Sequence, residues 1–82
     1  MAKFTVWAVT DCPYCDLARD LLLEKRLPHE IIITDKKKDL LIEVQQKFNW
    51  KTVPVITEEQ NGVEIFIGGY TDLVEYLERK TL

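Results

Sequence analysis

The first 34 residues alternate between strand-like and helix-like patterns, and this alternation limits the folds open to the chain. A run rich in β-branched and aromatic residues predicts a strand at about 3–9. From Pro13 to Arg26 apolar residues recur at helical spacing, and Pro28 ends that helix. The β-branched run at 30–34 predicts a second strand that is covered on both faces. A right-handed crossover would make the two strands parallel.

The second half of the chain predicts one more helix and a hairpin. Asp35 stands where a side chain would cap a helix, which we expect at about 36–48. Residues 53–57 and 63–67 form two further β-rich runs. Residues 58–62 join them and end in Asn-Gly, a strong signal for the turn of an antiparallel hairpin.

The chain ends in a third helical pattern. Gly68-Gly69 interrupts the last strand-like run, and apolar residues at helical spacing then predict a helix at about 71–80. The order β-α-β-α-β-β-α predicts an α/β protein with a four-stranded mixed sheet flanked by three helices. With 82 residues the chain has room for one domain, which we expect to span 1–82.

Composition and charge exclude several classes of function. Hydrophobic residues make up 46% of the chain and charged residues 30%, as in an ordinary globular protein. The formal net charge of −3 disfavours nucleic-acid binding, which usually shows a basic surplus. No apolar run is long enough to cross a membrane, and the N-terminus lacks the pattern of a signal peptide. We therefore expect a cytoplasmic protein that acts without nucleic acid or membrane.

Two cysteines, Cys12 and Cys15, stand where the first strand gives way to the first helix. A thiol at a helix start meets free backbone N–H groups and the positive end of the helix dipole, and both favour the thiolate. Pro13 suits the first helical turn, where its missing N–H costs nothing. Helical neighbours at i and i+3 lie close enough to form a disulfide, and so short a loop stabilises the fold little. The pair therefore predicts a reversible dithiol/disulfide site.

Other interpretations of the cysteine pair are weaker. The two thiols could be buried hydrophobic residues or half of a metal site. The single histidine, His29, is far along the chain, so a tetrahedral zinc site would need ligands from two chains. We expect no metal.

Three motifs in the same order together resemble one protein family. They are Cys12-Pro13-Tyr14-Cys15 at the first strand–helix junction, Thr52-Val53-Pro54 at the start of a later strand, and Gly68-Gly69-Tyr70-Thr71-Asp72-Leu73 before the last helix. A Cys-x-x-Cys pair alone is only moderately specific. With the other two motifs in register, the chain resembles the small dithiol glutaredoxins over nearly its whole length.

The resemblance implies a thioredoxin-like fold and a glutathione-disulfide oxidoreductase. Glutathione would serve as reductant and co-substrate, and the substrates would be protein disulfides and glutathione mixed disulfides. Similar proteins act as monomers, and ribonucleotide reductase is a common partner. Two alternatives stay open. One is a glutaredoxin-like electron donor that is reduced by a thioredoxin-type reductase. The other is a non-enzymatic redox-sensing binding module.

The resemblance also implies roles for individual residues. Cys12 would be the nucleophile and Cys15 the resolving thiol. The glutathione-binding residues would be Tyr14, Lys51, Thr52, Val53, Pro54, Gly69, Tyr70, Thr71 and Asp72. An extended peptide can pair with the backbone at Val53 beside a cis-Pro54. A helix start favours a carboxylate, whereas Asp72 can meet an α-ammonium group.

Two points of the site stay open in the sequence. Thr71-Asp72 would also serve simply as a helix cap. Trp50 could either rim the glutathione groove or simply pack against its neighbours.

The chain departs from the family pattern around the thiols. Val9 stands where relatives often carry Lys or Arg, and the carboxylates of Asp11 and Asp16 would oppose thiolate formation if they were close. The 13 residues from 55 to 67 also make a longer hairpin than we expect for a small glutaredoxin.

Overall fold

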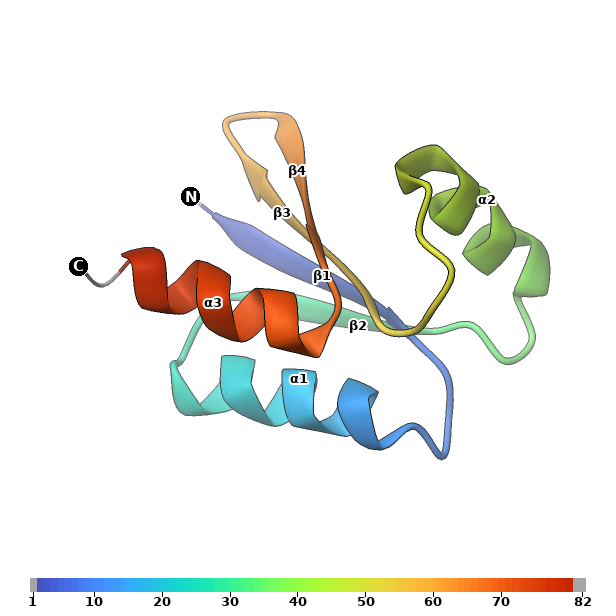
Figure 1. The fold of residues 1–82 in the computed structure, drawn as a ribbon, viewed down its shortest axis with the longest axis horizontal. Coiled ribbons are helices and arrows are strands. Elements are labelled where there is room, and N and C mark those ends of the chain that lie inside the picture. The colour runs from blue at the N-terminus through green and yellow to red at the C-terminus, as the bar shows by residue number, and fades with distance from the viewer. Residues whose placement is uncertain (1, 81–82) are drawn as a thin grey trace.

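The computed structural model describes residues 2–80 and contains the seven predicted elements in the predicted order (Figure 1). Their bounds are β1 Lys3–Ala8, α1 Pro13–Glu24, β2 His29–Ile33, α2 Lys38–Phe48, β3 Val55–Gln60, β4 Val63–Gly68 and α3 Tyr70–Lys80. None of these helices is long and apolar enough to cross a membrane.

The four strands form one mixed sheet in the order β2-β1-β3-β4. Strand β1 pairs in parallel with β2, as predicted for two strands connected through α1, and antiparallel with β3. Strands β3 and β4 form the antiparallel hairpin. The predicted thioredoxin-like fold, with a four-stranded mixed sheet and three helices, is confirmed.

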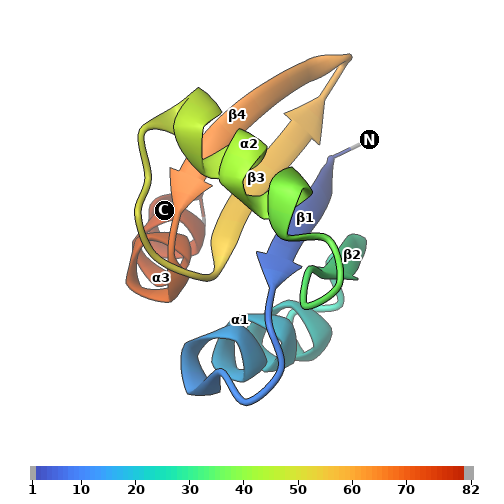
Figure 2. The same ribbon diagram turned by 90° about the vertical axis from the view of Figure 1, so that its right-hand side faces the viewer.

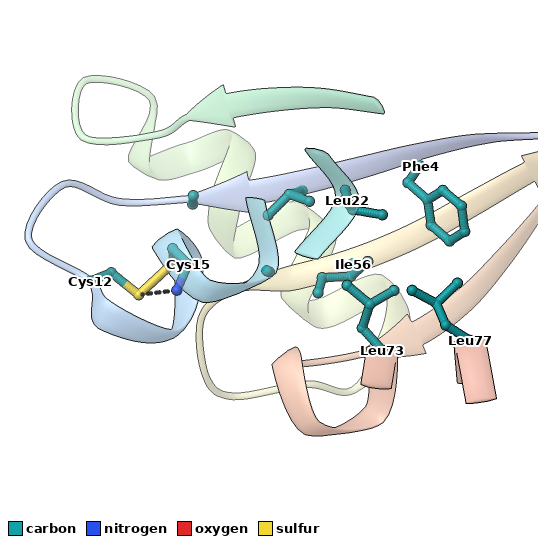
Figure 3. Packing of buried hydrophobic residues seen from close by; sticks show 10 residues of the cluster. Phe4, Cys12, Cys15, Leu22, Ile56, Leu73 and Leu77 are labelled. Atoms are coloured by element: carbon teal, nitrogen blue, oxygen red, sulfur yellow. Dashed lines mark hydrogen bonds between the residues drawn. A yellow bond between two sulfur atoms is a disulfide. The ribbon is translucent and has the colours of Figure 1, made fainter. Parts of the chain in front are cut away.

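One face of the sheet carries the main core. Phe4, Val6 and Ala8 of β1 are buried and, because strand side chains alternate between faces, they all point to the same side. They cluster there with residues of α1 and α3, the two helices that lie together on one face of the sheet (Figures 1 and 2). Figure 3 shows how this cluster packs. Its buried members are Phe4, Val6, Ala8, Cys12, Cys15, Ala18, Leu22, Ile56, Leu73 and Leu77. The two cysteines lie at the edge of the core, so the packing of α1 also fixes their position.

The opposite face is covered by α2 and held by aromatic rings. Phe48 at the end of α2 stacks on Phe66 of β4 with ring centroids 4.8 Å apart. Trp50, in the segment after α2, meets the same Phe66 edge-on at 5.3 Å. Within α2 the buried residue is Val44. Ring contacts to Phe66 therefore connect the sheet both to α2 and to the segment that leads to Pro54.

The start of α2 differs from the prediction. The helix begins at Lys38, and Asp35 does not cap it. The carboxylate of Asp35 instead accepts hydrogen bonds from the backbone N–H of Thr10, at 3.0 Å, and from its hydroxyl. These bonds lower the pKa of Asp35, with the hydroxyl contributing most. The predicted cap was wrong because Asp35 ties the β2–α2 connection to the loop after β1.

The hairpin also differs from the prediction. Strand β3 continues to Gln60, so Asn61 and Gly62 alone form the turn. Both have positive φ, 52° and 79°, as a type I′ turn requires. The predicted turn is confirmed, but residues 58–60 belong to the strand and not to the loop. The extra length of this segment is therefore taken up by longer strands.

Glu58 explains why β3 is longer than predicted. Its side chain is 1% exposed and accepts hydrogen bonds from the Tyr76 hydroxyl and from Lys80 Nζ, at 3.1 and 3.2 Å to its two oxygens. Gln60 Nε2 donates a further bond at 2.8 Å. Burial opposes ionisation of Glu58, but these donors outweigh it and lower its pKa. We call Glu58, Tyr76 and Lys80 the Glu58 cluster.

Candidate active site

The two cysteines lie at the start of α1. Cys12 is the N-cap residue with extended backbone, and Pro13 follows at the first helical position, as predicted. The Cα atoms of Cys12 and Cys15 are 5.2 Å apart, and the two sulfurs are joined in a disulfide (Figure 3). The helix geometry therefore brings the pair within bonding reach without any change in the fold.

The sulfur of Cys12 also takes part in the helix cap. Cys12 Sγ accepts a hydrogen bond from the backbone N–H of Cys15 at 3.2 Å (Figure 3). The N–H groups of the first helical turn have no partner inside the helix, and here the sulfur accepts a hydrogen bond from one of them. Cys12 is 8% exposed and Cys15 4%. Cys12 is therefore the more accessible of the two and the one held by the helix start.

The acidic residues beside the thiols turn out to be exposed. Asp16, in the first turn of α1, lies 3.5 Å from Arg19 in an exposed ion pair. Asp11 is exposed and has a left-handed backbone with φ 55°. Val9 is half-buried and packs against the core. Solvent and Arg19 thus screen the two carboxylates that depart from the family pattern.

A groove of about 330 Å³ collects most of the predicted ligand-binding residues. Its lining comes from three separate parts of the chain: Tyr14; Trp50, Thr52, Val53 and Pro54; and Gly69, Tyr70, Thr71 and Asp72. Lys51 is not among the lining residues. It is exposed and lines a neighbouring hollow beside the C-terminal half of α2.

One wall of the groove is the segment before β3. The Val53–Pro54 peptide bond is cis, as the resemblance implies. The pairing of β3 with its neighbours begins at Val55, so Val53 lies just outside the sheet. Gln45 of α2 donates a hydrogen bond to the Thr52 carbonyl at 3.1 Å and anchors this segment. An extended ligand could therefore align with the Val53 backbone as a short additional strand.

The opposite wall is the start of α3. Asp72 Oδ2 accepts a hydrogen bond from the Gly69 N–H at 2.9 Å, so the capping role left open in the sequence is real. Gly68 has φ 126°, and a Cβ there would lie 2.5 Å from Asp72 Oδ2, so only glycine fits. A carboxylate has about four lone-pair sites, so one backbone bond leaves capacity for a ligand.

Aromatic rings border the groove. Tyr14, 59% exposed, and Tyr70 have ring centroids 6.3 Å apart. Trp50 lines the groove and also packs on Phe66, so both interpretations of this residue hold. Sequence reasoning missed Gln45, because nothing local predicts that a helix glutamine reaches a carbonyl seven residues along the chain.

Comparison with known proteins decides the family. Residues 4–63 match the family model described as Glutaredoxin. The chain belongs to the glutaredoxin family. A dithiolic glutaredoxin of Trypanosoma brucei brucei, 2-C-Grx1, is 33% identical, with a TM-score of 0.73 over 95% of this chain and 78% of the other. Comparison with curated protein sequences gave no match.

Two further solved structures share the fold of this glutaredoxin. A buckwheat glutaredoxin–glutathione complex is 22% identical, with a TM-score of 0.78 over 94% of this chain and 69% of that one. The glutaredoxin-like NrdH-redoxin of Escherichia coli is 17% identical, with a TM-score of 0.66 over 92% and 93% of the two chains. Family membership together with the Cys12–Cys15 pair indicates thiol–disulfide oxidoreductase chemistry.

Proposed function

We propose that this glutaredoxin reduces protein disulfides and glutathione mixed disulfides with glutathione as its reductant. The observation that carries the proposal is the groove. It joins the cis-Pro54 segment to the start of α3 and is bordered by Tyr14, which lies between the two cysteines in the chain. Glutathione is an extended tripeptide with a zwitterionic γ-glutamyl end. Val53 offers it backbone pairing, and the α3 start offers both N–H groups and the Asp72 carboxylate.

The reaction with a glutathione mixed disulfide needs only Cys12. Its thiolate attacks the glutathione sulfur of the mixed disulfide, and the substrate thiolate leaves and takes up a proton. A second glutathione thiolate then attacks the glutathionyl sulfur on Cys12. This step releases oxidised glutathione and restores the Cys12 thiolate, which the helix start stabilises as a leaving group.

The reaction with a protein disulfide needs both cysteines. The Cys12 thiolate attacks one sulfur of the substrate disulfide and forms a mixed disulfide with it, while the other substrate sulfur leaves as a thiolate and takes up a proton. Cys15, 5.2 Å away between Cα atoms, then attacks Cys12 Sγ and releases the reduced substrate. One glutathione thiolate then attacks Cys12 Sγ and releases Cys15 as a thiolate that takes up a proton. A second glutathione thiolate attacks the glutathionyl sulfur, releases oxidised glutathione and restores the Cys12 thiolate. The acceptors would include ribonucleotide reductase, and the protein would act as a monomer in the cytoplasm.

The decisive experiment couples turnover to glutathione reductase and follows NADPH consumption with a glutathionylated peptide as substrate. We expect the wild type and Cys15→Ser to turn over and Cys12→Ser to be inactive. Full activity of Cys12→Ser would contradict the proposal. Turnover only when a thioredoxin-type reductase replaces glutathione and glutathione reductase would favour the electron-donor alternative. Inactivity with both systems would favour a redox-sensing binding module.

A further inference from the structure

The groove contains one residue that the family motifs do not assign. Trp50 precedes the Thr52-Val53-Pro54 segment by two positions and lines the groove together with it. It lies on the side where the groove meets the start of α3, because a Cβ built at Gly69 would lie 3.6 Å from Trp50 Cζ2. The same point is 3.9 Å from Asp72 Oδ2. The indole edge and the Asp72 carboxylate therefore approach Gly69 from the same side.

The aromatic contacts of Trp50 hold the indole in this place. Its ring meets Phe66 edge-on at 5.3 Å, and Phe66 in turn stacks on Phe48 at 4.8 Å. Such ring pairs are worth more than their buried area alone. The indole is thus a preformed wall whose position is set by α2 and β4.

The part of Trp50 that lies nearest the start of α3 is its ring. Trp50 Nε1 is buried and has no hydrogen-bond partner among residues 2–80. A buried tryptophan N–H usually finds a partner, and leaving it unpaired is unfavourable. What the ring supplies is a flat apolar surface beside a carboxylate.

We propose that Trp50 determines specificity for the γ-glutamyl arm of the thiol. The inference rests on the proposed function, in which Asp72 binds the α-ammonium group of that arm. Two methylene groups separate the α-carbon of a γ-glutamyl residue from its amide, and they would lie against the indole. The ring also excludes water beside Asp72, which strengthens the pairing of the carboxylate with the ammonium group.

The test compares three reducing thiols on a small disulfide that contains no glutathione, bis(2-hydroxyethyl) disulfide. Glutathione and γ-glutamylcysteine have the γ-glutamyl arm, and cysteinylglycine lacks it. We expect Trp50→Ala to raise KM for the first two about tenfold, as loss of contact with two methylenes would, and to leave cysteinylglycine unchanged. The value of kcat should stay near wild type. Trp50→Phe should restore KM to within about threefold, because phenylalanine keeps an apolar ring.

The outcomes separate this inference from the proposed function. If the wild type turns over with glutathione but Trp50→Ala changes all three thiols equally, or none, the specificity role is overturned and the proposed function stands. If the wild type does not turn over with glutathione, both fall. Thermal unfolding of each variant, followed by circular dichroism, shows whether it is folded under the assay conditions.

Fluorescence gives a second readout that does not depend on turnover. Trp7 of β1 is the only other tryptophan in the sequence and is not among the groove residues. In Trp7→Phe the emission comes from Trp50 alone. We expect S-methylglutathione, which cannot react, to change this emission saturably, and S-methylcysteinylglycine to have at least a tenfold weaker effect. Equal responses to the two probes would contradict the proposal.

Discussion

Helix α3 meets a carboxylate at each end, and the two carboxylates have different surroundings. At its start Asp72 accepts one bond, from the Gly69 N–H, and lines the groove. Toward its end Tyr76 and Lys80 donate hydrogen bonds to the Glu58 carboxylate. Glu58 also accepts a hydrogen bond from the Gln60 side chain and is only 1% exposed. A carboxylate surrounded by donors holds a fold together, whereas one with remaining capacity beside a groove can bind a ligand.

The largest expected effect is on stability, at the Glu58 cluster. Glu58→Ala leaves the Tyr76 hydroxyl without its acceptor and removes the partner of Lys80. We expect a loss of about 2–3 kcal/mol in the free energy of unfolding, measured by urea denaturation. Below its unfolding transition the variant should keep wild-type kcat/KM, because the cluster is at the far end of α3 from the groove.

The matched control is Glu59→Ala. This neighbour on the same strand is exposed, and we expect its substitution to change stability by less than about 0.5 kcal/mol. Equal losses in Glu58→Ala and Glu59→Ala would remove the distinction between a buried, satisfied carboxylate and an exposed one.

The next effect is on binding, at Asp72. In Asp72→Asn the side-chain oxygen can still accept the Gly69 N–H, but the negative charge is lost. We expect KM for glutathione to rise about tenfold, with a change in stability below about 0.5 kcal/mol. Steady-state kinetics and urea denaturation of the same preparation measure the two. A large stability loss with unchanged KM would show that Asp72 serves only as a cap.

The pH dependence of stability tests whether the buried Glu58 carboxylate holds the fold together. The pKa of Glu58 is lowered in the folded protein from its usual 4.5, so its stabilisation is complete above about pH 4.5 and is lost as the pH falls through the lowered value. Between about pH 5 and 3 the wild type should therefore lose more stability than Glu58→Gln. Urea denaturation at several pH values tests this. Parallel decline of the two proteins would contradict it.

The smallest expected effect is at Lys80. Its ammonium group pairs with buried Glu58, but the side chain is 43% exposed and solvent screens the pair. The Tyr76 bond to Glu58 also remains in Lys80→Met. We expect this variant to lose about 0.5–1 kcal/mol, measured by thermal and urea unfolding. A loss as large as that of Glu58→Ala would mean that Lys80, and not Tyr76, satisfies the carboxylate.

Local patterns in the sequence were enough to predict most of the fold. Pro28, Asn61-Gly62 and Gly68-Gly69 each separate two elements, and the alternation of periods sets their types. The errors arose where distant residues decide. The sequence predicts that Asp35 caps a helix, but in the structure its carboxylate binds Thr10, which is 25 residues away. The sequence predicts that Glu58 lies in a loop, but in the structure it is buried and accepts hydrogen bonds from Tyr76 and Lys80, which are 18 and 22 residues away.

The sequence motifs also predicted most of the residues that line the groove. The motifs placed Tyr14, Val53 and Asp72, and the structure brings them to one groove. The prediction for Lys51 rests on position alone, and sequence does not show that its side chain lines a neighbouring hollow. The role of Trp50 depends on Phe66 and Gly69, which only the folded chain brings beside it.

Because Cys12 Sγ accepts a hydrogen bond from the Cys15 N–H, the reactive sulfur also helps to cap helix α1. Reduction and unfolding then form a closed thermodynamic cycle. The stability difference between the reduced and oxidised forms must therefore equal the difference in disulfide free energy between the folded and unfolded chain, and the helix start adds to it by as much as it favours the thiolate over the disulfide sulfur. Two unfolding curves, one for each form, would therefore measure how far the fold shifts the reducing power of this dithiol from that of the unfolded chain.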